Sequence, residues 1–355
     1  MRKGLCEISN PKQWKTISTE MLTPNGYPVY GANGIIGYFS DYNHTEETLL
    51  ITCRGATCGS LNICEPYSYV NGNAMAIDNL SEEVDLKYLY YYLLNRGLDD
   101  VITGSAQPQI VRQSLTKVYV EYPELKEQKE IVSSLNKVEQ LIFLRKRQLS
   151  KLDELVKSRF IEMFDCPCYP QVTIGELVTA KVPSVKKAFA PTDVIKYIDI
   201  SSIDNIRNVM TGYTEYVLQE APSRAQQHIQ KGDIVISTVR PNLKNVAITT
   251  YEDENLVASS GFCVLRATKC LPSYLMAIVC SEKFTESMVK LVTGANYPAI
   301  KDSDVLNYVV AFPPIEVQDE FAAFVEQIDK SKFEIQKSLE QLEILKKSLM
   351  QKYFG

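Results

Sequence analysis

The sequence predicts an α+β protein in which two globular α/β domains are separated by two long antiparallel coiled-coil helices and related by a pseudo-twofold internal repeat. Three observations predict this fold: a nine-residue phrase occurs twice, the surrounding sequence repeats with it, and each copy leads into a heptad pattern. ITGSAQPQI at 102–110 returns as VTGANYPAI at 292–300, 190 positions later. A chain of 355 residues is long enough for two such domains.

The repeat extends beyond the phrase. Residues 101–164 align with 291–354 without a gap. In each copy a Thr-Gly pair and a proline are followed by a second proline and, five residues later, by glutamine. Two unrelated amphipathic helices can share leucines by chance, but they are not expected to share these threonine, glycine, proline and glutamine positions as well. We therefore infer a duplicated structural unit.

A heptad pattern follows each of these glutamines. Eight of ten seam positions are apolar in each copy, and their alternating spacing of four and three lines one side of a helix, which is stable only against a second seam. We expect the first helix within 123–164 and the second within 313–355, each about 60 Å long at 1.5 Å per residue. Two amphipathic helices buried in one compact core are the alternative. The seam positions are Ile131, Leu135, Val138, Ile142, Arg145, Leu149, Leu152, Val156, Arg159 and Met163, then Phe321, Val325, Ile328, Lys332, Ile335, Leu339, Leu342, Lys346, Leu349 and Tyr353.

Short strand-like runs and turns fill the expected domains, 1–122 and 165–312. The two domains correspond loosely, because LLITCRGATCGSLNI and IVISTVRPNLKNVAI each present a strand, then Arg54 or Arg240, then a turn and another strand. Similarity is high in the helices and low in the globular parts. We infer that the helices are the scaffold and that the globular parts were free to differ.

Composition narrows the class of protein. With 45% hydrophobic and 23% charged residues and a mean hydropathy of -0.13, the chain resembles an ordinary globular protein. No apolar run approaches 18 residues and the first residues lack a signal-peptide core, so we expect a cytoplasmic protein with no membrane contact and reduced cysteines. The net charge of -5 argues against a protein that simply coats DNA; any affinity for DNA must come from local patches or a basic partner.

The order of these segments resembles the specificity subunit of Type I restriction-modification systems. GYPVYGANGIIGY, CRGATCG, TGSAQPQI and PELKEQKEIV carry the resemblance, and VTGANYPAI and FPPIEVQDEF repeat its most specific part. The resemblance implies two target recognition domains that each read one half of a split sequence in double-stranded DNA, with the paired helices as a ruler. It also implies two methyltransferase subunits and restriction-translocase subunits as partners. S-adenosylmethionine, ATP and magnesium are expected on those partners, and no cofactor on this chain.

Catalytic motifs are missing from the sequence. It has neither the (N/D)PP(Y/F) loop of a DNA methyltransferase nor the GxxxxGK(S/T) loop of a motor. His44 and His228 lie in polar segments and are expected to be solvated, and Cys53, Cys58 and Cys64 lack the spacing of a structural zinc site. We therefore expect a non-catalytic subunit without a metal. A nuclease with an unrecognised site and a coiled-coil scaffold are the rival interpretations.

Candidate DNA contacts are hydrogen-bonding side chains on turns, since arginine pairs with guanine and asparagine or glutamine with adenine. In the alternative interpretation, Arg54 and Arg240 pair with local carboxylates, Asn71 and Asn73 serve a turn, and the Thr-Gly phrases only cap the helices. The candidates are Tyr27, Tyr30, Arg54, Thr57, Asn71, Asn73 and Gln107 in the first domain, and Arg240, Asn242, Lys244, Ser259, Ser260, Asn296 and Tyr297 in the second.

Overall fold

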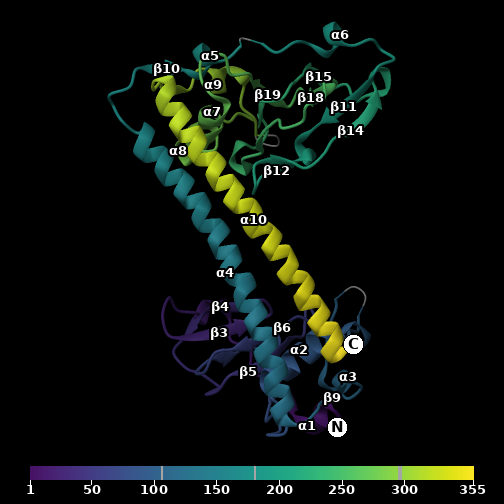
Figure 1. The fold of residues 1–355 in the computed structure, drawn as a ribbon. Coiled ribbons are helices and arrows are strands. Elements are labelled where there is room, and N and C mark those ends of the chain that lie inside the picture. Colours follow the sequence, from purple (N-terminus) through teal and green to yellow (C-terminus); the bar gives the residue numbers. More distant parts are fainter. Residues whose placement is uncertain (105–106, 180, 295–297) are drawn as a thin grey trace. The chain divides into compact units, whose positions relative to one another are not determined.

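The computed structural model describes residues 1–104, 107–179, 181–294 and 298–355. The chain divides into two compact units, each of which contains one globular domain and part of both long helices (Figure 1). The first unit comprises residues 1–146 and 337–355, and the second comprises 147–336. Within the described ranges, no helix combines the length and hydropathy that a membrane span requires.

The two long helices predicted from the heptads are confirmed. Helix α4 (Leu125–Phe164) and helix α10 (Ile315–Phe354) have 40 residues each, and both their first and their last residues are 190 positions apart. All twenty predicted seam positions are buried or half-buried, whereas apolar residues off the seam, such as Phe143 and Phe333, are exposed.

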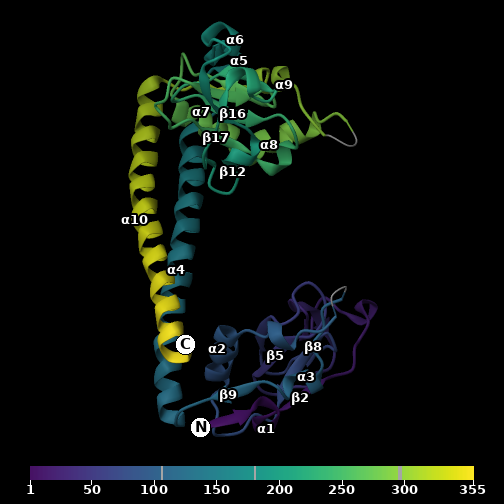
Figure 2. The ribbon, with the colours of Figure 1, turned by 90° about the vertical axis from the view of Figure 1, so that its right-hand side faces the viewer.

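Within each unit α4 and α10 run antiparallel, side by side (Figures 1 and 2). Ion pairs fix the direction, because a higher residue number on α4 meets a lower one on α10. The pairs are Glu139–Lys346 at 2.6 Å and Lys146–Glu343 at 3.5 Å in the first unit, and Asp153–Lys332 at 2.5 Å and Arg159–Glu320 at 2.7 Å in the second. Three of the four charged seam residues, Arg159, Lys332 and Lys346, take part in these pairs, so the opposite helix neutralises each of the three.

The domain of the first unit is built on a four-stranded sheet in the order β2-β8-β5-β6. A three-stranded sheet β4-β3-β7 and a small pair β1-β9 complete it. Its elements are β1 (Arg2–Gly4), α1 (Leu5–Ile8), β2 (Asn10–Gln13), β3 (Tyr27–Gly31), β4 (Gly34–Phe39), β5 (Thr48–Thr52), β6 (Leu61–Cys64), β7 (Tyr69–Val70), β8 (Ala74–Asp78), α2 (Leu86–Arg96), α3 (Arg112–Leu115) and β9 (Tyr119–Glu121).

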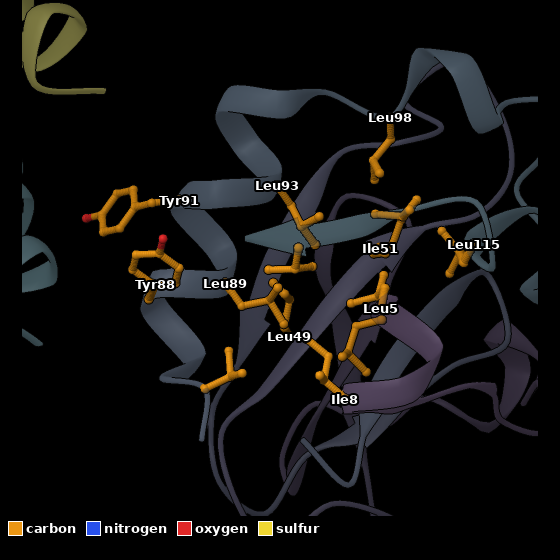
Figure 3. Packing of buried hydrophobic residues seen from close by; sticks show 14 of the residues in the cluster. Leu5, Ile8, Leu49, Ile51, Tyr88, Leu89, Tyr91, Leu93, Leu98 and Leu115 are labelled. Atoms are coloured by element: carbon orange, nitrogen blue, oxygen red, sulfur yellow. The ribbon is translucent and has the colours of Figure 1, made fainter. Parts of the chain in front are cut away.

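The three central residues of strand β5, Leu49, Leu50 and Ile51, are all apolar because both faces of its sheet are buried. Leu49 and Ile51 belong to the core that includes α2, while Leu50 belongs to a second cluster on the other face. Figure 3 shows Leu89 and Leu93 of α2 directed toward this core, with Tyr91 on the opposite side of the helix. The Tyr91 hydroxyl donates to Glu139 Oε2 of α4 at 2.7 Å, so α2 links the sheet to the long helix.

The domain of the second unit repeats this plan with more strands. Strand β16 again contributes to two clusters: Ile234 and Ile236 belong to the cluster that includes α7, and Val235 belongs to the other. Its elements are β10 (Gln171–Thr173), α5 (Ile174–Leu177), α6 (Val185–Ala188), β11 (Val194–Ile198), β12 (Ile203–Asp204), β13 (Val209–Met210), β14 (Thr214–Val217), β15 (Ala225–His228), β16 (Ile234–Ser237), β17 (Val246–Ile248), β18 (Leu256–Ser259), β19 (Phe262–Leu265), α7 (Pro272–Val279), α8 (Glu282–Lys290), α9 (Asp302–Leu306) and β20 (Val309–Ala311).

The repeated glutamine joins each domain to its long helix. Gln128 is fully buried; it accepts from the backbone N–H of Asp85 at 2.9 Å and donates to the carbonyls of Glu83 at 2.8 Å and Pro123 at 2.9 Å. Gln318 is also fully buried, accepts from the N–H of Leu271 at 2.9 Å and donates to the Pro313 carbonyl at 2.9 Å. Buried polar groups must be hydrogen-bonded, so the same side chain is required at both junctions.

Candidate nucleic-acid interface

In the first unit, the loop that follows β5 gathers three separate segments. The Cys53 N–H donates to the Asn73 carbonyl at 3.1 Å, and the Ile110 N–H donates to the Cys53 carbonyl at 3.0 Å. The Gly55 N–H donates to the Pro108 carbonyl at 3.2 Å. Backbone hydrogen bonds therefore hold the loop 53–59, the turn at Asn73 and the Thr-Gly phrase together.

The loop that follows β16 in the second unit has the same bonds. The Thr238 N–H donates to the Gly261 carbonyl at 3.0 Å, and the Ile300 N–H donates to the Thr238 carbonyl at 2.9 Å. The Arg240 N–H donates to the Pro298 carbonyl at 2.8 Å. Loop 238–244 is thus fixed to the second Thr-Gly phrase as loop 53–59 is to the first.

The two loops also share their backbone conformation. Each contains two left-handed residues, Gly55 and Gly59 with φ of 89° and 92°, and Arg240 and Lys244 with φ of 50° and 52°. These pairs are 185 positions apart, so Arg240 corresponds to Gly55, and the counterpart of Arg54 is Val239. The predicted equivalence of Arg54 and Arg240 is wrong by one residue. The sequences of the two strand-loop segments can be aligned in several registers, and only the backbone hydrogen bonds determine which register is correct.

Four candidates in the first unit lie exposed on these joined segments: Arg54, Thr57, Asn73 and Gln107. Arg54 forms no ion pair with the described part of the chain, so the alternative of a local carboxylate partner does not apply to it. The Thr57 hydroxyl donates to Asn33 Oδ1 at 2.5 Å, which brings the tip of the β3–β4 hairpin onto the loop.

Two candidates in the first unit are buried, and their prediction as DNA contacts is corrected. Asn71 is 3% exposed, with its carboxamide donating to the Ile17 carbonyl at 3.3 Å and accepting from the Gly72 N–H at 2.8 Å, so it serves the turn. Tyr30 is 6% exposed and its hydroxyl accepts from the Glu65 N–H at 3.3 Å; burial raises its pKa. Tyr27 is exposed and its ring packs edge to face on Tyr42, 4.8 Å between centroids.

In the second unit, Arg240 and Asn242 are exposed on the loop, and Arg240 has no ion pair among the described residues. Lys244 Nζ forms an ion pair with Glu282 Oε1 at 2.5 Å, and this hydrogen bond lowers the pKa of the Glu282 carboxyl. Ser260 is exposed, and its N–H donates to the Arg224 carbonyl at 2.8 Å.

Ser259 is a further correction, because it is 4% exposed and its hydroxyl accepts from the Gly261 N–H at 3.2 Å. The candidates Asn296 and Tyr297 lie outside the described residues. Gly104 and Gly294, within the two Thr-Gly phrases, have φ of 84° and 92°, a left-handed conformation that glycine adopts without strain.

Groups with catalytic or metal-binding potential have structural partners. His44 is buried, not solvated as predicted: its Nε2 lies 2.9 Å from Asp78 Oδ1 and its Nδ1 lies 2.6 Å from Asn43 Oδ1. Cys166 and Cys168 form a disulfide, in contrast to the reduced state expected for all cysteines. In the described part of the chain, no three His, Cys, Asp or Glu side chains are grouped as metal ligands.

Sequence reasoning missed the hairpin tips beside the loops. Asn33 contacts Thr57 in the first unit, and in the second the Asn205 carboxamide donates to the Leu243 carbonyl at 2.8 Å. An Asn-Gly turn signal is present at 33–34, but nothing in the sequence indicates which loop the tip touches. In both units the candidate interface therefore consists of a loop, a Thr-Gly phrase and a hairpin tip.

Two dissimilar domains with equivalent exposed loops, carried by one antiparallel helix pair, define a protein that presents two different recognition surfaces. Residues 2–154 and 170–344 match the family described as Type I restriction modification DNA specificity domain, so the chain belongs to that family. The match falls twice, once on each domain, and confirms the predicted fold class and family resemblance.

Individual relatives agree with this assignment. The chain is similar to the Type I restriction enzyme MjaVIII specificity subunit of Methanocaldococcus jannaschii, with 21% identity over 330 residues, 86% of this chain and 77% of the relative. It is 27% identical over 145 residues to the EcoprrI specificity subunit of Escherichia coli, 39% of this chain and 36% of the relative. Its fold resembles a crystal structure of a Type-I restriction-modification S subunit from M. genitalium, with a TM-score of 0.64 at 15% identity, covering 100% of this chain and 96% of that one.

Proposed function

We propose that the chain is the specificity subunit of a Type I restriction-modification complex and reads a bipartite sequence in double-stranded DNA. Residues 1–122 and 165–312 act as the recognition domains, and the helices 123–164 and 313–355 set the spacing between the two half-sites. A DNA target accords with the cytoplasmic location expected from the sequence.

One observation carries the proposal: a loop of the same backbone conformation occurs in both units, but its side chains differ. Arg54 and Thr57 in one loop are replaced by Val239 and Asn242 in the other. Arginine, threonine and asparagine offer different donors and acceptors to base edges in the major groove. Two equivalent loops with different side chains are what a split, asymmetric target requires.

Partner subunits supply the chemistry in this proposal. The net charge of -5 is unfavourable for tight binding to phosphates by this chain alone, since such binding requires clustered lysine and arginine. Methyltransferase subunits that clamp the DNA compensate for this charge and carry S-adenosylmethionine, while restriction-translocase subunits carry ATP and magnesium. The chain itself acts as a non-catalytic subunit.

Mapping methylated bases in cells with the gene present and deleted tests the proposal. A bipartite motif that disappears on deletion is the expected result. In complemented cells, Arg54→Ala relaxes one half of the motif and Arg240→Ala relaxes the other. Lys231→Ala is a matched control, because this exposed lysine pairs with Glu252 and precedes β16, whereas loop 238–244 follows the other end of that strand. A genome whose methylation does not depend on the gene contradicts the proposal and favours a coiled-coil scaffold.

The purified chain separates the proposal from the nuclease interpretation. Incubated with DNA, magnesium and S-adenosylmethionine, it is expected neither to cut nor to methylate. Activity that survives repeated purification and depends on a carboxylate of this chain contradicts the non-catalytic assignment.

A further inference from the structure

Strands β12 and β13 form a two-stranded ribbon that is a sheet of its own in the second unit. Ile203 pairs with Met210 and Asp204 with Val209, and the Thr211 N–H continues the ribbon by donating to the Ser202 carbonyl at 2.9 Å. Residues 205–208 connect the strands. The ribbon is therefore a short β-hairpin with a four-residue tip.

The tip holds an apolar and a cationic side chain out in solvent. Ile206 is 90% exposed, more than any other large hydrophobic residue in the described part of the chain. The neighbouring Arg207 side chain is 63% exposed, and its Nε lies 3.9 Å from Asp204 Oδ2, too far for a hydrogen bond. An apolar side chain of this size contributes nothing to folding when it is exposed to this degree.

Hydrogen bonds define the backbone conformation of the tip. Asp204 Oδ1 accepts from the N–H groups of Ile206 at 2.9 Å and Arg207 at 3.0 Å, and Asn208 closes the turn in the left-handed region with φ of 55°. The carboxylate of Asp204 is therefore used inside the turn. Asn205, Ile206 and Arg207 are the exposed residues of the tip.

The tip is also anchored to the recognition loop. Asn205 Nδ2 donates to the Leu243 carbonyl at 2.8 Å. Asn208 Nδ2 donates to the carbonyls of Lys244 at 3.3 Å and Val246 at 3.2 Å. Displacing the ribbon would thus displace loop 238–244, and the two elements form one surface.

A hairpin tip occupies the equivalent place in the first unit. The Thr57 hydroxyl donates to Asn33 Oδ1 at 2.5 Å, and the Thr52 hydroxyl donates to the Ala32 carbonyl. Thr57 and Asn242, like Thr52 and Ser237, occupy corresponding positions in the two loops. The first tip consists of Ala32 and Asn33, whereas the second tip includes Ile206 and Arg207, so the two composite surfaces have different chemistry.

We propose that the β12–β13 tip enters the DNA major groove and determines part of the half-site read by the second unit. Ile206 contacts a thymine methyl group and Arg207 contacts a guanine edge beside it. This inference rests on the proposed function. The major groove accepts a two-stranded ribbon, and thymine methyl groups are contacted by apolar side chains while guanine O6 and N7 accept from arginine. The guanidinium beside the isoleucine is also attracted to the phosphates that border a DNA groove.

The test uses the full chain, co-expressed with its methyltransferase partner in cells that lack the modification, and compares the methylation motifs of Ile206→Ala and Arg207→Ala with wild type. Each variant is expected to lose discrimination at a base pair of one half-site, roughly 5- to 150-fold for the arginine and less for the isoleucine. The other half-site and the spacer stay unchanged. Val194→Ala is the matched control, since Val194 is 50% exposed on β11 of the same unit.

Each other outcome overturns the inference. Motifs of unchanged stringency in both variants show that the tip reads no bases. Reduced co-purification of the methyltransferase with Ile206→Ala, without a change of motif, assigns the tip to a protein partner. A wild-type chain that directs no modification rejects the proposed function and this inference with it, whereas a functional wild type with insensitive tip variants rejects only the inference.

Discussion

Lengthening both long helices by one heptad is expected to widen the spacer of the DNA target and leave both half-sites intact. Insertion between Lys146 and Arg147 in α4 and between Gln336 and Lys337 in α10 leaves the internal contacts of each unit undisturbed. Seven residues at about 1.5 Å each add roughly 10 Å to each helix. At about 3.4 Å per base pair, this corresponds to roughly three additional base pairs.

A variant with four residues inserted at the same two places is the control for the heptad insertion. Four residues add roughly 6 Å but interrupt the alternating seam, so we expect weaker DNA modification and a spacer about two base pairs longer. Insertion into one helix alone mispairs the seams and is expected to abolish modification. The assay is sequencing of methylated genomic DNA from cells that carry each variant. A heptad variant that modifies DNA with an unchanged spacer, or with an altered half-site, refutes the reasoning.

Three further predictions concern stability. Gln128→Leu removes three buried hydrogen bonds and should lower the free energy of unfolding by about 2–4 kcal/mol, measured by urea titration followed by circular dichroism. The control Gln341→Leu changes an exposed glutamine and should alter this free energy by less than ~0.5 kcal/mol. Equal effects of the two variants would count against the role of Gln128 at the junction. Arg240→Gly should raise the free energy of unfolding by up to ~1 kcal/mol, because the left-handed conformation costs a non-glycine residue about 1–2 kcal/mol. The same variant should relax the half-site that the second unit reads. A large decrease in the free energy of unfolding would contradict this prediction. Lys346→Leu replaces the ion pair with Glu139, which contributes under ~1 kcal/mol, by apolar contact within the seam. The free energy of unfolding should therefore change little, and a decrease of more than ~1 kcal/mol would argue against the seam.

The helices could be predicted from sequence because their determinants are local and periodic. Heptads identify the seam without knowledge of the rest of the chain, and the duplicated register supplies the partner. The internal repeat also identified Gln128 and Gln318 as shared positions, but it did not predict that they join each domain to its long helix. Their role depends on the N–H groups of Asp85 and Leu271, which lie more than 40 residues away and have no pattern of their own.

The candidate interface was predicted less well because exposure depends on tertiary contacts. Asn71 and Asn73 are two residues apart and chemically identical, yet one is buried and bonded to Ile17 while the other is exposed. Composition cannot distinguish them. The register of Arg54 against Arg240 failed for the same reason, since backbone bonds to Pro108 and Pro298, and not side-chain identity, align the two loops.

This dependence on the backbone also explains how the two domains can differ so widely in sequence. The bonds that fix loops 53–59 and 238–244 to their Thr-Gly phrases join only N–H and carbonyl groups, so they place few demands on side chains. The left-handed positions are filled by two glycines in one loop and by arginine and lysine in the other without loss of the bonds. Side chains directed at DNA can therefore change while the loop keeps its conformation. Substitution on a fixed backbone is accordingly a physical route by which such a protein acquires a new target without losing its fold.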